Sequence, residues 1–251
     1  MRGVLDLRPP FRQHGRMRSF AFPSLAAAIV PLILSACGPS IDPAAKADID
    51  RRASVLRPGA NVVPAPAPGL QAPMPFAVGQ WTQYKMTDDK HEPSFLTQKI
   101  VGQQGDAIWL ETVTDTYSGR TVQKILFAIG NRMDPSTVEV RAVVMKDSKG
   151  RVQEIPPPAI SLMQSTYRGL LSALIVSWQG LPQESTAVPA GGFEGCFKAR
   201  TDAQWGPWRS VADSWAHPAV PLSGTVRSQG IDRPFTMELT AYGTSGATSE
   251  L

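Results

Sequence analysis

Residues 138–144 read Val-Glu-Val-Arg-Ala-Val-Val, and every second side chain from Val138 to Val144 is apolar. This strict alternation is typical of a β-strand that has one face on a core. The polar stretch Asp147-Ser148-Lys149-Gly150 follows and indicates a turn. Residues 235–239, Phe-Thr-Met-Glu-Leu, alternate in the same way. The pattern predicts sheet structure just after the middle of the chain and again near its C-terminal end.

Further alternating segments lie around these two, at residues 82–86, 95–101, 108–112, 122–129, 193–200, 208–215 and 222–228. Short polar turns separate neighbouring segments, for example at residues 102–106 and 117–119. Successive strands joined by short turns predict an antiparallel meander. We therefore expect a mainly β fold of about nine or ten strands.

One strong helix is predicted after Pro156-Pro157-Pro158, because this run blocks a strand and apolar residues then recur at helical spacing as far as Gly180. The apolar positions are Ile160, Met163, Tyr167, Leu170, Leu171, Leu174 and Trp178. The opposite face carries Ser161, Gln164, Ser165, Arg168 and Ser172. Such a helix should lie on the sheet. A core helix is the favoured interpretation, and a mobile lid over a cavity beneath Leu170 and Leu174 is the alternative.

The chain begins with the features of an export signal, a basic segment and a short apolar run that ends at Leu34-Ser35-Ala36-Cys37. The run from Ala21 has 14 residues, whereas a membrane-spanning helix needs about 20. The last four residues resemble a bacterial lipobox. This resemblance implies signal cleavage between Ala36 and Cys37, diacylglycerol on the Cys37 thiol and acylation of the new amino terminus. A plain secretory signal or a buried helix is the alternative.

The residue after Cys37 is Gly38 and not aspartate. By analogy with lipoprotein sorting in enterobacteria-like envelopes, this favours the outer membrane. We therefore expect a lipid-anchored protein of the bacterial cell envelope, on the periplasmic face of the outer membrane. Two or more acyl chains supply a stable anchor.

These features divide the chain into three parts. Residues 1–36 form the signal peptide, with Met17 as an alternative start, and residues 37–76 form a lipidated cysteine and a Pro- and Ala-rich linker that should act as a spacer. Residues 77–251 form a single β-rich domain. Within the linker, one or two helical turns are expected after Asp42, with Asp42 as the N-cap and Pro43 at the first position.

The formal net charge of +4 does not indicate nucleic-acid binding, because it belongs to the leader. Residues 1–37 hold five arginines and one aspartate, and the remainder holds 20 basic and 20 acidic residues. No nucleic-acid partner is expected for a neutral domain. The expected partners are the membrane, through the lipid anchor, and either a lipid or other apolar ligand or another envelope protein.

Signals for catalysis and for metal binding are weak. Cys196 is the single cysteine after the leader, and burial is favoured over a redox or nucleophilic role. His91 and His217 are too few for a zinc site. His217 lies near Asp213 and Ser214 in the sequence, but no Gly-x-Ser-x-Gly motif accompanies them. We therefore expect no catalytic residue, no metal, and no cofactor other than the covalent lipid on Cys37.

Trp205-Gly206-Pro207-Trp208 places a tryptophan on each side of a turn. Exposed, Trp205 and Trp208 would form a ligand or partner surface; buried, they would hold the hairpin together. Burial is the favoured interpretation.

The C-terminal part resembles uncharacterised bacterial envelope lipoproteins and, distantly, the lipoprotein carriers of the LolA/LolB type. The resemblance rests on residues 188–193, Val-Pro-Ala-Gly-Gly-Phe, on Ser214-Trp215, on residues 220–224, and on Met237-Glu238-Leu239-Thr240 with Tyr242-Gly243. It implies a strongly curved antiparallel sheet, an incomplete barrel whose concave apolar face holds acyl chains under helices. The carriers have more helices than the one that is evident here. The family is not enzymatic, so no catalytic residue is implied.

Three functional hypotheses follow. The first is a non-enzymatic outer-membrane lipoprotein whose curved sheet, with one substantial amphipathic helix packed on it, binds an apolar ligand. The second is a structural or assembly lipoprotein that holds another envelope protein. The third and weakest is an envelope hydrolase that uses His217.

Overall fold

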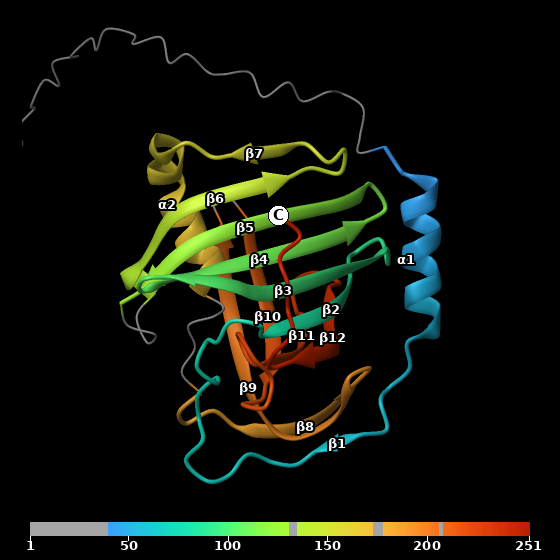
Figure 1. Cartoon of the computed structure of the whole chain (residues 1–251). Coiled ribbons are helices and arrows are strands. Elements are labelled where there is room, and N and C mark those ends of the chain that lie inside the picture. The colour runs from blue at the N-terminus through green and yellow to red at the C-terminus, as the bar shows by residue number, and fades with distance from the viewer. Residues whose placement is uncertain (1–39, 131–134, 173–177, 206–207) are drawn as a thin grey trace, which may run out of the picture. The chain divides into compact units, whose positions relative to one another are not determined.

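The computed structural model describes residues 40–130, 135–172, 178–205 and 208–251. In this part of the chain, twelve strands form one sheet, accompanied by two α-helices and a short 3-10 helix (Figure 1). The helices are α1 (Pro43–Val55), η1 (Pro135–Thr137) and α2 (Pro157–Ser172). The strands are β1 (Val62–Val63), β2 (Trp81–Thr87), β3 (Pro93–Gln104), β4 (Ala107–Thr116), β5 (Gly119–Ile129), β6 (Val138–Lys146), β7 (Val152–Glu154), β8 (Gln183–Val188), β9 (Gly191–Trp205), β10 (Trp208–Ala216), β11 (Thr225–Gly230) and β12 (Thr236–Gly243).

The sheet consists of two meanders, β9–β12 and β2–β7, which are joined by the pairing of β12 with β2. Its order is β1-β9-β10-β11-β12-β2-β3-β4-β5-β6-β7, and β8 pairs with β9 off this path. All pairs are antiparallel except β1 with β9. The sheet does not close on itself, which confirms the predicted open, mainly β architecture. The predicted number of strands was too low because β1, β7 and β8 were missed, and β1 and β7 have only two and three residues.

Helix α2 lies between the two ends of this open sheet. It contacts β6 near one end and β9 near the other, and Figure 1 shows β9 running steeply across the direction of β3 to β6. Three apolar side chains of α2, Ile160, Tyr167 and Leu171, are buried against the sheet. We call the sheet face that α2 covers the inner face.

Two apolar clusters fill the inner face. The first joins α2 to strands β3–β6 and to Leu222, and contains Ile100, Leu110, Ile125, Phe127 and Val143 among others. The second lies under β8 and the turn before β11, and contains Tyr84, Val188, Phe193, Cys196, Val220, Val226 and Leu239. Burial of this apolar surface is the main driving force for the fold.

A bulge at Arg141 corrects the predicted alternation in β6. Phe127 pairs with Val140, but Leu126 pairs with Ala142, so Arg141 is an extra residue in the ladder. An extra residue reverses the faces of the side chains that follow it. Val140 therefore joins the inner cluster with Val138, whereas Ala142 packs beside Leu126 on the outer face. The expectation that Val138, Val140, Ala142 and Val144 share one apolar face was wrong.

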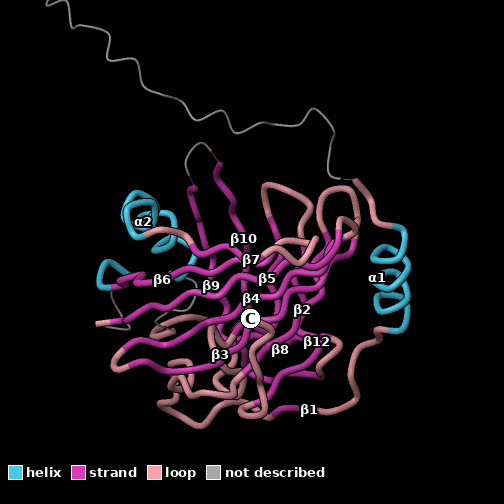
Figure 2. The backbone as a smooth tube through the Cα atoms, turned by 45° about the horizontal axis from the view of Figure 1, so that its top comes forward, coloured by secondary structure: helices cyan, strands magenta, loops and turns pink. Residues whose placement is uncertain are grey.

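The segment assigned to a linker also packs on the sheet. Helix α1 begins as predicted, with Asp42 Oδ1 accepting hydrogen bonds from the backbone N–H groups of Ala44 at 2.9 Å and Ala45 at 3.4 Å. Its Ile49 is buried, and Arg52 donates to Asp115 of β4 at 2.8 Å. Both views in Figures 1 and 2 place α1 and α2 at separate margins of the strands. Residues 43–63 thus contribute a helix and a strand to the folded unit, which spans Pro39–Leu251.

Candidate functional site

The predicted lipidation motif, Leu34-Ser35-Ala36-Cys37, lies outside the described residues. The cleavage site between Ala36 and Cys37, the lipid on Cys37 and the membrane location therefore remain predictions.

The predicted ligand surface at Trp205, Trp208, Leu170 and Leu174 is only partly described. The backbones of Trp205 and Trp208 pair directly across the β9–β10 hairpin, so the two residues belong to one turn. Leu170 lies within α2. The side chains of these three residues, and all of Leu174, are outside what the structure describes.

His217 is a buried structural residue. Its Nδ1 accepts a hydrogen bond from the Ala219 N–H at 3.1 Å, so the proton lies on Nε2, which donates to the Pro64 carbonyl at 3.1 Å. Burial lowers the pKa of His217, and the bond to Pro64 opposes this only partly. Both ring nitrogens are occupied by backbone groups, so the ring has none left to activate a nucleophile.

The neighbours proposed for a hydrolase also have other partners. Asp213 pairs with Arg200 through a 2.9 Å hydrogen bond, and the Ser214 hydroxyl lies 3.0 Å from that of Ser228. His217, Asp213 and Ser214 therefore do not form a catalytic arrangement. These residues do not support the hydrolase hypothesis.

Cys196 is buried, as predicted. Desolvation raises the pKa of its thiol to about 12. The thiol therefore stays protonated near neutral pH, and a thiolate nucleophile is not expected.

The inner face is the first candidate for a binding surface. Ile125 and Phe127 of β5 lie beneath α2, and both are buried. The helical pattern predicted that Gln164 and Arg168 of α2 face solvent, but both side chains contact the edge of β6. The Gln164 side chain donates to the Val140 carbonyl at 2.7 Å and accepts from the Val140 N–H at 3.3 Å, while Arg168 donates to the Val138 carbonyl at 3.0 Å. These contacts cover the part of the β6 edge that the short β7 leaves open.

Helix α2 also carries apolar side chains on its solvent side. Leu162 is 87% exposed and Met163 is 41% exposed. Met163 was expected on the buried face. The two residues are adjacent in the chain and form a small exposed apolar surface. Such surfaces, when they are extended, mark contacts with a protein, a membrane or an apolar ligand.

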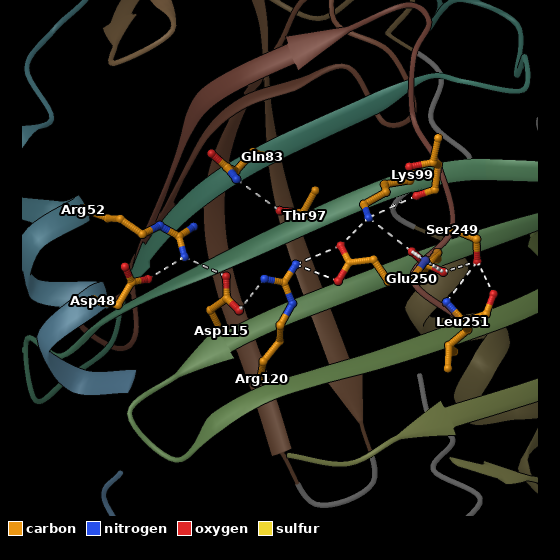
Figure 3. Close-up of polar contacts among 12 residues, drawn as sticks. Asp48, Arg52, Gln83, Thr97, Lys99, Asp115, Arg120, Ser249, Glu250 and Leu251 are labelled. Carbon is orange, nitrogen blue, oxygen red and sulfur yellow. Dashed lines mark hydrogen bonds and ion pairs between the residues drawn. The ribbon is translucent and has the colours of Figure 1, made fainter. Parts of the chain in front are cut away.

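The outer face carries a cluster of charged residues and one serine that the sequence did not indicate (Figure 3). Glu111 of β4 is fully buried and accepts hydrogen bonds from Lys99 Nζ at 3.2 Å, Ser249 Oγ at 2.6 Å and the Glu250 N–H at 3.0 Å. The Glu250 carboxylate contacts Lys99 at 2.6 Å and Arg120 at 2.8 Å. We call these five residues the outer-face cluster.

The cluster fixes the ionisation of Glu250. Partial burial raises the pKa of this carboxyl, but the hydrogen bonds and charges of Lys99 and Arg120 outweigh burial and hold the pKa below its usual value. Glu250 is therefore a carboxylate at neutral pH and keeps the segment 247–251 against the sheet.

A groove of about 470 Å³ lies on the same face. It is lined by Trp109, Lys124, Val144, Lys146, Val152 and Glu154 of β4–β7, together with Glu250 and Leu251. The Lys124 ammonium lies 5.1 Å from the centre of the Trp109 ring. The bulge at Arg141 is what turns Val144 to this face, so alternation alone could not have revealed the groove.

Neither metal nor membrane-spanning sites emerge from the described residues. In that part of the chain, no group of three or more His, Cys, Asp or Glu side chains could hold a metal ion. Among the same residues, no helix has the length and apolarity needed to cross a membrane.

Comparisons with known proteins add little. No protein-family model and no curated protein matches the chain. A Bacteroides fragilis structure, named as a candidate exported protein with a YmcC-like fold, is 11% identical over 69% of this chain and 100% of its own, with a TM-score of 0.36. A Parabacteroides distasonis structure, named as a candidate lipoprotein, is 13% identical over 69% of this chain and 99% of its own, with a TM-score of 0.30. These similarities carry no argument about this chain, and the similarity to LolA/LolB carriers remains a prediction.

Proposed function

We propose that the protein is a lipid-anchored protein of the bacterial outer membrane and that its folded unit is a non-enzymatic binding module for an apolar ligand. The anchor rests on the lipobox ending at Cys37. The binding role rests on the position of α2, a single amphipathic helix that lies over an apolar inner face between the two ends of an open sheet.

Two features of α2 suit a cover that exchanges with a ligand. Its polar bonds to the sheet in the described residues are those of Gln164 and Arg168 to the edge of β6, so lifting α2 breaks no strand pair. Its exposed Leu162 and Met163 give it a second apolar surface. An acyl chain would replace the side chains of Ile160, Tyr167 and Leu171 over the inner face.

Native mass spectrometry tests this function on residues 39–251, produced in a periplasm and purified without detergent, then mixed with palmitate. This unit holds every described helix and strand and their apolar clusters, so it should fold without the leader. We expect a reproducible added mass of one or more acyl chains.

Two adjacent residues of β5 provide a matched pair of variants. Ile125 lies in the inner cluster and Leu126 packs on the outer face. Each truncation to alanine costs about 2–5 kcal/mol of stability, so circular dichroism must first show that both variants fold. Ile125→Ala removes a packed side chain beneath α2 and should raise palmitate occupancy, whereas Leu126→Ala should match the wild type. Absence of bound palmitate in both the wild type and Ile125→Ala would contradict the proposal.

The outer-face groove favours a second candidate function, a structural module that holds another envelope protein. A photo-crosslinking residue at Val152, which lines the groove, should give a discrete protein adduct in intact cells. The same residue at Lys90, in an exposed turn away from the groove, should not. No adduct from Val152 would count against this function.

A further inference from the structure

We propose that the outer-face groove binds an extended acidic segment of a partner protein; this inference rests on the second candidate function, assembly with another envelope protein. The chain itself provides the template for this mode of binding, because its residues 247–251 lie across the same face.

The segment 247–251 crosses the strands in order. The Ala247 N–H donates to the Gly79 carbonyl, just before β2, at 2.9 Å. Thr248 contacts Lys99 of β3, and Ser249 contacts Glu111 of β4. Leu251 then lines the groove, whose other walls come from β4 to β7. The groove therefore continues the path of this segment across the remaining strands.

The outer-face cluster recognises an acidic residue by two kinds of group. A buried carboxylate, Glu111, accepts the backbone N–H of Glu250. Two cations, Lys99 and Arg120, hold the carboxylate of the same residue. The main chain and the side chain are thus both fixed, which specifies an acidic residue in an extended segment.

The groove offers the same types of group, with the difference that its carboxylate is exposed and Glu111 is buried. Lys124 and Lys146 supply two ammonium groups, and Glu154 supplies a carboxylate. Lys124 and Val144 are cross-strand partners, as are Lys146 and Val152, so the cations alternate with apolar side chains on one face. An acidic residue seated here would place its carboxylate on the lysines and an N–H group on Glu154. Trp109, Val144 and Val152 would receive the apolar side chain beside it.

The ammonium groups of Lys124 and Lys146 are available to pair with the carboxylate of such a ligand. Across the residues with described side chains, no ion pair involves Lys124 or Lys146, and Lys124 donates to the neutral Ser249 hydroxyl at 3.3 Å. Glu250, the other acidic residue of the groove, is already held by Lys99 and Arg120. Among the side chains that line the groove, two ammonium groups therefore face one carboxylate, Glu154, that is not already paired.

The same arrangement disfavours an anionic membrane as the occupant. The anionic head group of phosphatidylglycerol has no N–H donor for Glu154, and this carboxylate, which lines the groove together with the two lysines, repels the phosphate. An anionic membrane surface attracts a cluster of cations and is repelled by a carboxylate among them. A peptide supplies both a carboxylate and main-chain N–H groups.

The test is an NMR titration of isotope-labelled residues 39–251 with two blocked peptides, acetyl-Leu-Glu-Glu-Val-amide and acetyl-Leu-Lys-Lys-Val-amide. The acidic peptide should shift the Trp109 indole N–H resonance, assigned with Trp109→Phe, and the amides of β5–β7. Binding should saturate and should weaken with salt. The basic peptide should cause no saturable shift.

Two double variants test whether the groove lysines bind the acidic peptide. Lys124→Ala with Lys146→Ala should raise the dissociation constant of the acidic peptide by roughly five- to tenfold, the size expected for two exposed ion pairs. Lys85→Ala with Lys90→Ala removes the same charge on β2 and its turn and should leave the dissociation constant unchanged. Equal binding of both peptides, or equal effects of the two double variants, would overturn the inference.

Two further outcomes separate this inference from the assembly function. Sedimentation with vesicles that contain phosphatidylglycerol, without any binding of the acidic peptide, would assign the lysines to a membrane and overturn the inference. If the peptide fails to bind while Val152 still gives a protein adduct in cells, the acidic chemistry is wrong but the assembly function stands. If both fail, the assembly function fails as well.

Discussion

Replacing Glu111 by alanine should loosen Ser249 and Glu250 on the sheet and destabilise the folded unit by about 3 kcal/mol. Removing one partner of a buried ion pair costs about 3–5 kcal/mol when the other charge is left alone. Lys99 keeps Glu250 at 2.6 Å, and the freed Ser249 and Glu250 donors are near solvent, so the lower end applies. For a domain of this size class, about 3 kcal/mol lowers Tm by roughly 6–12 °C.

Urea unfolding of residues 39–251 measures the loss of free energy, and hydrogen exchange measures the protection of the Glu250 amide. Glu111→Gln keeps an acceptor oxygen without the charge and should lose about half as much. Glu139→Ala removes an exposed carboxylate from β6 and should cost less than about 1 kcal/mol. A loss below about 1 kcal/mol for Glu111→Ala, or unchanged protection of the Glu250 amide, would refute the role given to the outer-face cluster.

Three further predictions concern the inner side of the sheet. Burial lowers the pKa of His217 from its usual value of 6.5, so the unfolded chain is protonated before the folded protein as the pH falls. The contribution of His217 to stability should therefore be complete above about pH 6.5 and should decrease as the pH falls towards the pKa of the folded protein. The free energy of unfolding, measured with urea between pH 5 and 7, should vary less with pH for His217→Gln than for the wild type. Gly224→Ala would place a methyl group 2.5 Å from the Trp178 ring at a φ of +73°, and should cost more than about 2 kcal/mol by the same assay. Gln164→Ala should cost about 1–3 kcal/mol, because it leaves the edge groups of β6 without their partner, and should raise light scattering on storage.

The long strands could be predicted because each one has a face on the core. Residues 235–239 alternate in sequence, and Leu239 is fully buried in β12. The N-cap at Asp42 was also predictable, because capping depends on local chemistry. Short strands at the margins gave no such signal: β7 has three residues, and all of them are exposed.

An apolar face under a helix was expected, but the outer-face cluster and the outer-face groove could not be predicted because they depend on register and on long-range contacts. Arg141 looks like any polar residue between two apolar ones, yet its bulge decides that Val144 faces the groove. Glu111 and Glu250 are 139 residues apart, and neither has a sequence pattern that marks it as a partner of the other. A buried Glu within an alternating strand is the one available hint, since it requires a partner.

The way the two meanders are held together bears on how a ligand could enter. Pairing of β12 with β2 joins them, and the chain then leaves β12 at Gly243 and crosses β3 to β5 through the outer-face cluster. The junction is therefore secured from the outer face, on the side away from α2. Opening the inner face requires α2 to leave Ile125 and Phe127 and to release the β6 edge, but it breaks none of the strand pairs and none of the outer-face contacts. A sheet that stays intact while its cover moves is the arrangement that an exchangeable apolar ligand needs, and it leaves the outer-face groove unchanged for a partner.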